Sequence, residues 1–356
     1  MVGARPNFVK MAPVLEGLTA QGVGFRLLHT GQHYDRALSD DFIERLGMRA
    51  PDANLGAGSG SHGEQTAAVM VGVEQELQEH PATLVLVAGD VNSTMAAALA
   101  ASKLQIAVAH VESGLRSRDW TMPEEVNRVV TDRVSELLFC TSADAVDNLA
   151  AEGIAGGRVQ LVGNTMIDSL QRMLTGVDRD AVLAEQDVGA RGFTLVTLHR
   201  PALVDDPVRL GAVIEVLAGV AERLPVLFPA HPRTLRGLRE AGVEPPPGLR
   251  LMDPLDYDRF IALEAEARLV ITDSGGVQEE TSVLGVPCIT YRTTTERPIT
   301  TEFGTNRLVG VNPEALAAAC AAELEREPPA DPPRIPLWDG HAGTRAAGAI
   351  AEWVLR

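Results

Sequence analysis

The sequence has few cysteines and no long run of apolar residues. Its three cysteines, Cys140, Cys288 and Cys320, lie far apart and form neither a metal-binding nor a redox spacing. We interpret them as structural thiols, which favours a reduced, cytoplasmic location. Because no apolar run is long enough to cross a bilayer and no secretory signal is recognisable, we expect no association with a membrane.

Positive charge is also scarce, and lysine is almost absent. The chain has 31 basic and 48 acidic residues, which gives a formal net charge of -17. This argues against nucleic acid as a partner, because binding it requires the neutralisation of many phosphates. Lysine occurs only at Lys10 and Lys103. A small anionic ligand would therefore be held mainly by arginines, which suit bidentate contacts with phosphate.

Two further absences limit the choice of cofactor. The Gly-x-Gly-x-x-Gly fingerprint of dinucleotide-binding folds does not occur, so a tightly bound nicotinamide cofactor is not indicated. The acidic, histidine and cysteine residues form no cluster with the spacing of metal ligands. We therefore expect neither a metal nor an organic cofactor.

What the sequence contains is a regular alternation of strand-like and helical stretches. At 356 residues, two domains are expected. The apolar, strand-like runs form one series at 25–30, 84–88, 107–111, 137–140 and 159–162, and a second at 194–197, 225–229, 249–251, 268–272 and 288–291. This pattern predicts an α/β protein with two doubly wound, Rossmann-like domains, over residues 1–168 and 169–340.

The start of the chain departs from this pattern. Gly3-Ala4-Arg5-Pro6-Asn7 reads as a glycine turn that opens a helix containing Lys10, yet no strand is recognisable before it. The first strand of a doubly wound sheet is usually central. We therefore expect a start that lies a few residues further upstream; the alternative is a fold that tolerates the loss of this strand.

A strand, a glycine turn, a helix and a second strand follow one another between residues 268 and 291. The first strand ends at Asp273, and Ser274-Gly275-Gly276 allows the backbone to approach a ligand. The next helix directs unsatisfied N–H groups and its positive dipole end toward that ligand. An ordinary strand-to-helix turn is the alternative. The whole pattern favours a seat for the phosphates of a nucleotide, with Glu280 placed to accept hydrogen bonds from sugar hydroxyls.

Acidic residues follow two predicted strands in the first half. Asp90 follows the strand at 84–88 and Glu112 ends the next one, so both are expected at the sheet edge where open α/β folds bind ligands. Pro123 begins a helix on which Glu124 and Arg128 share a face. Read alone, Asp90 could be a helix N-cap, and the second pair a solvated ion pair worth about 0.3–0.5 kcal/mol. Together they predict carboxylates that converge on one cleft.

Basic residues follow the strands of the second half. His199 and Arg200 come after the strand at 194–197, and His231 after the strand at 225–229. Histidine at a strand end suits phosphate or acid/base contacts near neutral pH. A structural role explains His231 equally well, whereas His199 beside an arginine is the stronger candidate. Arg297 follows the last strand and is expected near Gly276.

These motifs, in this order, resemble those of the non-hydrolysing UDP-N-acetylglucosamine 2-epimerases. The resemblance covers essentially the whole chain. It rests on Gly3-Ala4-Arg5-Pro6, Thr30-Gly31-Gln32-His33, Gly89-Asp90, the block from His110 to Arg116, the block from Pro123 to Arg128, Val162-Gly163-Asn164-Thr165, Leu198-His199-Arg200, the block from Asp273 to Glu280, and Thr295-Glu296-Arg297-Pro298. It implies a glycosyltransferase-B-like fold whose two domains face a central cleft that holds a UDP-sugar. It also implies a last helix, 341–356, that crosses back to the first domain, and a homodimer.

The chemistry of such a reaction can be argued beside the resemblance. The C2 proton of an N-acetylhexosamine is not next to a carbonyl, and the chain shows no hydride carrier that would create one. UDP, however, is a good leaving group, and cleavage of the C1–O bond makes the C2 proton removable. Elimination would give a 2-acetamidoglucal, to which UDP re-adds with a proton delivered to the opposite face.

The resemblance also assigns roles to individual residues. The acid/base and oxocarbenium-stabilising carboxylates with their charge partner match Asp90, Glu112, Glu124 and Arg128, and His199 matches the histidine that meets the departing UDP. Nucleotide contacts match Arg5, Lys10, Ser274, Gly275, Gly276, Glu280 and Arg297, and Phe260 could stack nearby. A UDP-N-acetylhexosamine is thus the expected partner.

Other functions stay open at this stage. A hydrolysing relative that releases N-acetylmannosamine and UDP would share nearly every residue named, and a glycosyltransferase of the same fold would share the phosphate seat. A binder of nucleotide sugars without activity is a more distant alternative. Pro201-Ala202-Leu203 replaces a polar Arg-Glu-Asn sequence that often occurs in the family. A modified UDP-hexosamine, such as a diamino or uronic acid derivative, is therefore an alternative substrate.

Overall fold

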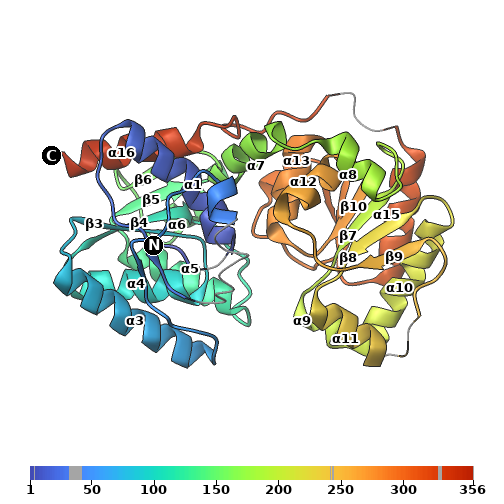
Figure 1. Ribbon diagram of the computed structural model, residues 1–356, viewed down its shortest axis with the longest axis horizontal. Coiled ribbons are helices and arrows are strands. Elements are labelled where there is room, and N and C mark those ends of the chain that lie inside the picture. Colours follow the sequence, from blue (N-terminus) through green and yellow to red (C-terminus); the bar gives the residue numbers. More distant parts are fainter. Residues whose placement is uncertain (4, 32–41, 241, 243, 328–330, 356) are drawn as a thin grey trace. The chain divides into compact units, whose positions relative to one another are not determined.

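The computed structural model describes residues 1–3, 5–31, 42–240, 242, 244–327 and 331–355, and it divides into two compact units. Unit 1 comprises Met1–Gln171 and Pro336–Arg356, and unit 2 comprises Arg172–Ile335 (Figure 1). Every described strand pair in both units is parallel, which confirms the predicted α/β class. Gln32 and His33 of the sequence motifs, and Ala4, lie outside the described residues.

Unit 1 contains two hydrogen-bonded strand groups, β1-β2 and β3-β4-β5-β6. Its strands are β1 (Leu28–His29), β2 (Ala53–Asn54), β3 (Leu84–Ala88), β4 (Ala107–Ser113), β5 (Leu137–Cys140) and β6 (Val159–Leu161). Its helices are α1 (Arg5–Ala20), α3 (His62–Glu79), α4 (Asn92–Lys103), α5 (Pro123–Val134), α6 (Ala143–Ala151) and α16 (Ala342–Val354), and α7 (Thr165–Thr175) leads into unit 2.

The first residues of the chain connect these two strand groups. Val2 forms a parallel bridge with His29, and the Met1 amino group donates a hydrogen bond of 2.7 Å to the carbonyl of Leu86 in β3. Val2 thus occupies a strand position between β1 and β3, although the sequence shows no recognisable strand before Gly3. The reversal in strand order of unit 1 therefore falls beside the glycine turn that opens α1.

The last helix of the chain packs on the first. A Cβ atom added to Gly17 of α1 would lie 2.6 Å from the Cβ of Ala347 in α16, and one added to Gly343 would lie 2.4 Å from the Cβ of Pro13. Both distances are too short for real side chains, so glycine at both positions permits this close approach of two helix backbones.

Unit 2 is built around one six-stranded sheet of order β12-β11-β10-β7-β8-β9. The strands are β7 (Thr194–Thr197), β8 (Val226–Pro229), β9 (Leu249–Met252), β10 (Leu269–Thr272), β11 (Cys288–Thr290) and β12 (Asn306–Leu308). The helices are α8 (Arg179–Glu185), α9 (Pro201–Val204), α10 (Pro207–Ala221), α11 (Pro232–Glu240), α12 (Tyr257–Glu266), α13 (Gly275–Leu284), α14 (Ile299–Glu302) and α15 (Pro313–Glu325). This is the Rossmann order, with its switch point between β7 and β10.

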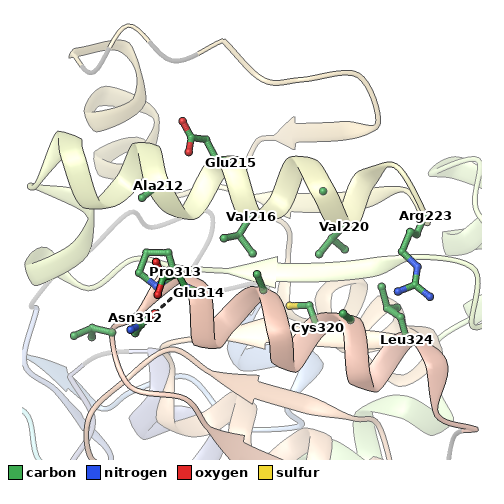
Figure 2. A pocket seen from close by; sticks show the side chains of 14 residues that line it. Ala212, Glu215, Val216, Val220, Arg223, Asn312, Pro313, Glu314, Cys320 and Leu324 are labelled. Carbon is green, nitrogen blue, oxygen red and sulfur yellow. Dashed lines mark hydrogen bonds between the residues drawn. The ribbon is translucent and has the colours of Figure 1, made fainter.

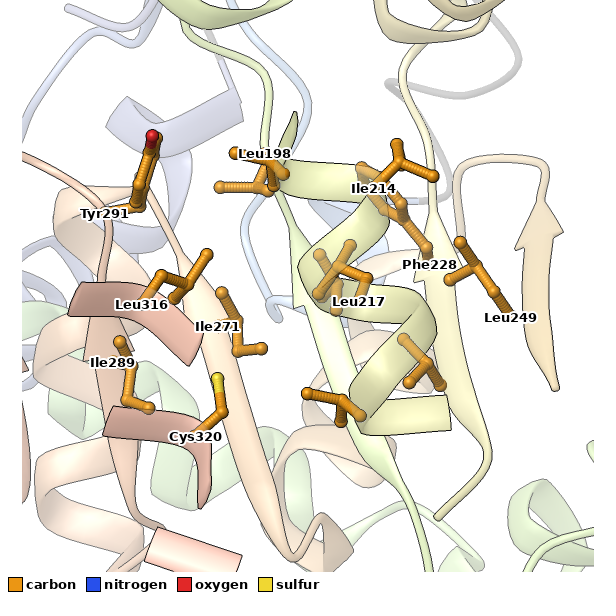
Figure 3. Close-up of a cluster of buried hydrophobic side chains, with 14 of the residues drawn as sticks. Leu198, Ile214, Leu217, Phe228, Leu249, Ile271, Ile289, Tyr291, Leu316 and Cys320 are labelled. Carbon is orange, nitrogen blue, oxygen red and sulfur yellow. The ribbon is translucent and has the colours of Figure 1, made fainter. Parts of the chain in front are cut away.

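Alternating side chains of this sheet enter two different cores. Leu269 and Ile271 of β10 pack with α10 and α15 in the cluster that Figure 3 shows, whereas Val270 between them packs with α12 and α13 on the other face. A strand buried on both faces has apolar residues at every position, because successive side chains point to opposite sides. This burial explains why the sequence identifies the central strands well.

Candidate active site

Asp90 lies just beyond the carboxyl end of β3, where the chain turns into α4. Gly89 has φ +68°, a conformation that glycine adopts without strain, and its N–H donates 3.0 Å to the carbonyl of Val111 in β4. The Asp90 side chain is 25% exposed and forms an ion pair with Arg128 of α5. Asn127 of the same helix donates 2.9 Å to the Asp90 carbonyl, so α5 holds both parts of this residue.

Glu112 occupies a strained position at the end of the neighbouring strand. The register of β4 on β5 shifts between Val111 and Ser113, so Glu112 is the extra residue of a β-bulge, and its φ is +67°. Such a backbone conformation is costly for a residue other than glycine and redirects the side chain. Glu112 is 7% exposed and forms an ion pair with Lys10, which reaches it from α1.

Lys10, Glu112 and Gly89 are packed tightly together. A Cβ atom on Gly89 would lie 2.9 Å from Nζ of Lys10 and 3.3 Å from Oε2 of Glu112. The described contact of Lys10 is thus with this carboxylate. The carboxyl ends of β3 and β4 therefore bring Asp90 and Glu112, each with a basic partner, to adjacent positions in unit 1.

Glu124 and its neighbour Glu125 have different environments in the first turn of α5. Glu124 is exposed, whereas Glu125 is 1% exposed and accepts 2.7 Å from Nη1 of Arg128. The Glu125 carboxylate also accepts hydrogen bonds of 2.9 Å from both the N–H and the hydroxyl of Ser117. The sequence spacing places Glu124 and Arg128 on one face of α5, with an ion pair between them as the alternative to a catalytic role. The described ion pairs of Arg128 are with Glu125 and Asp90.

A buried charge network fixes the strand ends behind these carboxylates. Asp132 of α5 is fully buried and accepts hydrogen bonds from Nδ1 of His110 (2.6 Å), Nη1 of Arg116 (2.7 Å) and the N–H of Gly114 (3.1 Å). The other ring nitrogen of His110 lies 2.8 Å from the carbonyl of Gly89. Both partners of His110 are acceptors, so each of these contacts is a hydrogen bond when the ring nitrogen that faces it carries a proton.

The electrostatics of Asp132 follow from this geometry. Burial by itself raises the pKa of the carboxyl, but the hydrogen bonds and charges of His110 and Arg116 outweigh burial and hold its pKa below the ordinary value. Asp132 therefore joins Gly89 at the end of β3, through His110, to Gly114 after the Glu112 bulge. The sequence analysis did not identify Asp132, because nothing in its local spacing distinguishes it.

In unit 2, Asp273 connects the ends of the two strands that flank the switch point. Its carboxylate, 1% exposed beyond β10, accepts hydrogen bonds from the N–H groups of His199 (3.0 Å) and Arg200 (2.8 Å) after β7. Nδ1 of His199 lies 3.1 Å from the other carboxylate oxygen. A neutral His199 that donates from Nδ1 to Asp273 carries its acceptor lone pair on Nε2. The side chain of His199 is 48% exposed.

His231 has a different position, at the start of α11. Its Nδ1 accepts 3.2 Å from the N–H of Arg233, which caps the helix. Burial lowers the pKa of His231, and the charges of His199 and Arg233 lower this pKa further. The structure thus gives His231 a local structural contact.

The predicted phosphate seat forms the N-terminus of α13. Ser274 is the N-cap residue and makes no side-chain capping hydrogen bond, and Gly275 is the first helical residue. A Cβ atom on Gly275 would lie 2.5 Å from Nη1 of Arg297, so this guanidinium packs directly over the start of the helix. Glu279 orients Arg297 through an ion pair of 3.0 Å between Oε1 and Nε. The helix end and the arginine together suit an anion.

Glu280 is buried one turn into α13. It is 3% exposed, and the hydroxyl of Tyr257 on α12 donates 2.5 Å to its Oε1. Burial raises the pKa of Glu280, against the opposing effect of the hydrogen bonds with Tyr257 and Glu264. Phe260, also on α12, is partly buried against the core of that side of the sheet.

Three further points concern Arg5, metal ligands and membrane-spanning helices. Arg5 begins α1, but its side chain lies outside the described part of the structure. Among the described residues, no group of three or more His, Cys, Asp or Glu side chains is arranged to hold a metal ion. Within the same residues, none of the helices is both long and apolar enough to span a bilayer.

A separate groove of about 800 Å³ runs between α10 and α15 on the outside of unit 2 (Figure 2). Val216, Val220 and Leu324 contribute to its lining, and Glu215 and Arg223 lie at its polar parts. It contains none of the residues predicted to bind or transform a substrate. Its position behind the sheet, on the face opposite α13, separates it from the strand ends that carry the candidate residues.

Comparison with known proteins gives a consistent result. The profile of the UDP-N-acetylglucosamine 2-epimerase family matches residues 17–351. The chain is 39% identical over 343 residues to the UDP-N-acetylglucosamine 2-epimerase of Methanocaldococcus jannaschii, covering 92% of each chain. It is 38% identical to the UDP-2,3-diacetamido-2,3-dideoxy-D-glucuronate 2-epimerase of Pseudomonas aeruginosa, covering 100% of this chain and 98% of the relative.

Solved structures agree with these sequence relatives. The crystal structure of the M. jannaschii UDP-GlcNAc 2-epimerase in complex with UDP-GlcNAc and UDP is similar with a TM-score of 0.90, covering 99% of this chain and 98% of that one. A glycosyltransferase of kitacinnamycin, at 13% identity and a TM-score of 0.55, shares the fold alone.

Proposed function

Because the chain belongs to the UDP-N-acetylglucosamine 2-epimerase family, we propose that it is a non-hydrolysing enzyme that interconverts UDP-N-acetylglucosamine and UDP-N-acetylmannosamine. The observation that carries this proposal is the pairing of Asp90 with Arg128 and of Glu112 with Lys10 at adjacent strand ends of unit 1. Epimerisation requires one group that takes the proton from one face of C2 and another that delivers a proton to the opposite face, and carboxylates at two neighbouring strand ends can supply such a pair. A transferase that uses the phosphate seat alone would not need them.

The proposed reaction has two reversible steps. In the first, a base takes the C2 proton, the C–H electrons form a C1–C2 double bond, and UDP leaves C1 with the electron pair of the broken C1–O bond. The product is 2-acetamidoglucal. In the second, a phosphate oxygen of UDP bonds to C1 again while an acid delivers a proton to the opposite face of C2, so no external reactant is consumed.

We assign the acid/base work and the stabilisation of the oxocarbenium charge to the set Asp90, Glu112 and Glu124, with Arg128 as charge partner. The partial exposure of the Asp90 side chain supports direct contact with the sugar. Glu112 lies in a β-bulge and has a strained backbone conformation. Strain of this kind is concentrated at functional sites, which supports a catalytic role for Glu112. Glu124 is solvent-exposed and able to reach a ligand, whereas its neighbour Glu125 is buried and accepts a hydrogen bond from the backbone N–H of Ser117.

Unit 2 is proposed to hold the nucleotide. The start of α13 at Ser274, Gly275 and Gly276, with Arg297 beside it, would bind the diphosphate, and Glu280 would accept hydrogen bonds from the ribose. In its protonated form, His199 would donate from Nε2 to the departing UDP, while Nδ1 donates to Asp273, which fixes the ring. Arg5 and Phe260 remain candidates for further nucleotide contacts. We propose no metal or organic cofactor, because arginine and helix N–H groups suffice for the diphosphate charge.

A second candidate substrate is a UDP-hexosamine that carries a second acetamido group and a uronic acid carboxylate. The full-length similarity to the P. aeruginosa 2-epimerase favours it, and so does Pro201-Ala202-Leu203 in place of a more polar sequence. A homodimer and a cytoplasmic location complete the proposal.

Proton NMR in deuterated water tests the reaction. The protein is incubated with UDP-N-acetylglucosamine, and separately with the diacetamido uronic acid analogue. Deuterium at C2 of a sugar that still carries UDP would support the proposal and rank the two substrates. Free N-acetylmannosamine would instead establish a hydrolysing enzyme, and no exchange with either nucleotide sugar would refute both forms of the proposal.

A further inference from the structure

A second glutamate is buried beneath Glu280. Glu264 lies in the last turn of α12 and is 0% exposed. Within the described residues, no N–H or O–H group donates a hydrogen bond to either of its carboxyl oxygens. Its carboxyl lies within hydrogen-bonding range of the Glu280 carboxyl on α13. A fully buried, ionised carboxylate without a donor would be very costly.

The two carboxyl groups have unequal surroundings. Glu280 accepts a hydrogen bond of 2.5 Å from the hydroxyl of Tyr257, which favours its ionised form. Glu264 has no such donor. Two carboxylates side by side both accept and cannot bond to each other, whereas one shared proton converts the contact into a strong O–H···O bond. The proton therefore belongs on Glu264, from which it points to Glu280.

We propose that Glu264 is a positioning residue that retains a proton at neutral pH and donates it in a hydrogen bond to Glu280, which keeps Glu280 ionised and oriented for the ribose of a uridine nucleotide. The proposal rests on the ribose contact assigned to Glu280 above. With Tyr257 on one side and Glu264 on the other, both donors restrict the carboxylate before any ligand arrives. The ligand then meets an acceptor that is already oriented.

Few other titratable groups face this pair. On α12 the hydroxyl of Tyr257 adjoins Glu280, and burial raises the pKa of that hydroxyl well above its ordinary value. On β11 the thiol of Cys288 is close enough to Glu264 for their charges to interact, and burial raises the pKa of Cys288 to about 12. The charged residues of α8, which packs against α12, are exposed: Arg179, Asp180 and Glu185. None of these groups supplies a positive charge to Glu264.

Burial raises the pKa of Glu264 well above its ordinary value of 4.5. At a pH between the pKa of the unfolded chain and the higher pKa of the native protein, the native protein holds a proton on Glu264 that the unfolded chain has lost. The free energy of unfolding therefore falls as the pH rises through this range. Glu264→Gln replaces the protonated acid by a neutral donor of the same shape. The melting temperature of E264Q relative to wild type should therefore increase as the pH rises above the ordinary pKa of the carboxyl. A difference in melting temperature between E264Q and wild type that is constant with pH would refute the proposal that Glu264 retains a proton, whichever ligand the protein binds.

Titration calorimetry with UDP tests the positioning role on the full chain. At neutral pH E264Q should bind UDP within about threefold of wild type, because its amide still donates to Glu280. E264L, which has no donor, should bind about ten- to a hundredfold more weakly, the range that one lost hydrogen bond to a charged group represents. Above the titration of the pair, wild type should lose affinity while E264Q retains it.

A ribose probe separates failure of this inference from failure of the proposed function. The preference of wild type for UDP over 2′-deoxy-UDP should persist in E264Q and shrink in E264L, with both variants checked for folding by circular dichroism. If wild type binds UDP but E264L matches it, the positioning role is refuted and the proposed function stands. If wild type fails to bind UDP, the proposed function fails, and the melting experiment still decides where the proton lies.

Discussion

Replacement of Asp132 by asparagine should both destabilise unit 1 and slow turnover. Asp132 has no exposed surface, and it accepts hydrogen bonds from His110, Arg116 and the N–H of Gly114. Asparagine keeps one acceptor oxygen but turns an amide NH₂ group toward groups that also donate. It also removes the negative charge that faces His110 and Arg116. Removing one partner of a buried charge pair typically costs about 3–5 kcal/mol.

The structure indicates that the loss of unfolding free energy lies near the lower end of this range. Arg116 keeps a second partner, because its Nε and Nη2 each donate 2.7 Å to the carboxylate of Glu152. We therefore expect a loss of about 3 kcal/mol, which corresponds to a fall in melting temperature of about 6–12 °C for a unit of this size. Turnover should fall at least about tenfold, because His110 then holds the Gly89 carbonyl less firmly and small displacements of catalytic groups are costly.

Calorimetry and steady-state kinetics together test this reasoning. Glu152→Gln is the matched control, because it also loses a charge beside Arg116 but from a side chain that is 34% exposed. It should cost no more than about 1 kcal/mol and leave turnover unchanged. UDP affinity should be equal in all three proteins, since the proposed nucleotide seat belongs to unit 2. An Asp132→Asn protein with the stability and turnover of wild type would refute the positioning role of the network.

The pH dependence of the same variant gives an independent check. The pKa of Asp132 lies below the ordinary value of 3.8 in the native state, so the unfolded chain binds more protons over that window. The stabilisation by Asp132 is therefore complete above pH 3.8 and is lost as the pH falls through the native pKa. The difference between wild type and Asp132→Asn should shrink in strong acid. A difference that grows on acidification would contradict this sign.

Three further substitutions test other parts of the molecule. Asp90→Asn should abolish C2 deuterium exchange but retain UDP binding by calorimetry; loss of UDP binding would show that Asp90 has another role. Asp273→Asn should lower the rate of UDP elimination about tenfold or more, because His199 loses its charged partner. Unchanged kinetics would refute a catalytic role for the pair of His199 and Asp273. Gly17→Val should cost about 1–3 kcal/mol by forcing α1 from α16, and a melting curve identical to wild type would disprove that close contact.

The fold class was predictable because the described strands pair in parallel and are mostly buried. Central strands such as β5 and β10 are almost entirely apolar in the sequence, and helical stretches separate the strands. The short edge strands β2 and β12 were missed. They have only two and three residues, and their partly exposed side chains make no apolar run.

The positions of Asp90, Glu112 and the start of α13 were also predictable, since a residue that directly follows a buried strand lies at the ligand-binding edge. Side-chain partners were not. The choice of Arg128 between Glu124 and Glu125 depends on which face of α5 is buried, and spacing allows both. Asp132 and Glu264 gave no signal at all, because a buried carboxyl within a helix is recognised only through what it contacts.

Strand order explains why contacts between residues far apart in the sequence could not be predicted from the sequence. Asp273 bonds to His199 and Arg200, more than seventy positions earlier, because β7 and β10 are neighbours at the switch point of unit 2. In unit 1, Asn7 donates 2.7 Å to the carbonyl of Ala88, because Val2 lies between β1 and β3. At a reversal in strand order two successive loops diverge and leave a crevice. The residues that border it come from distant segments, so topology must be known before they can be paired.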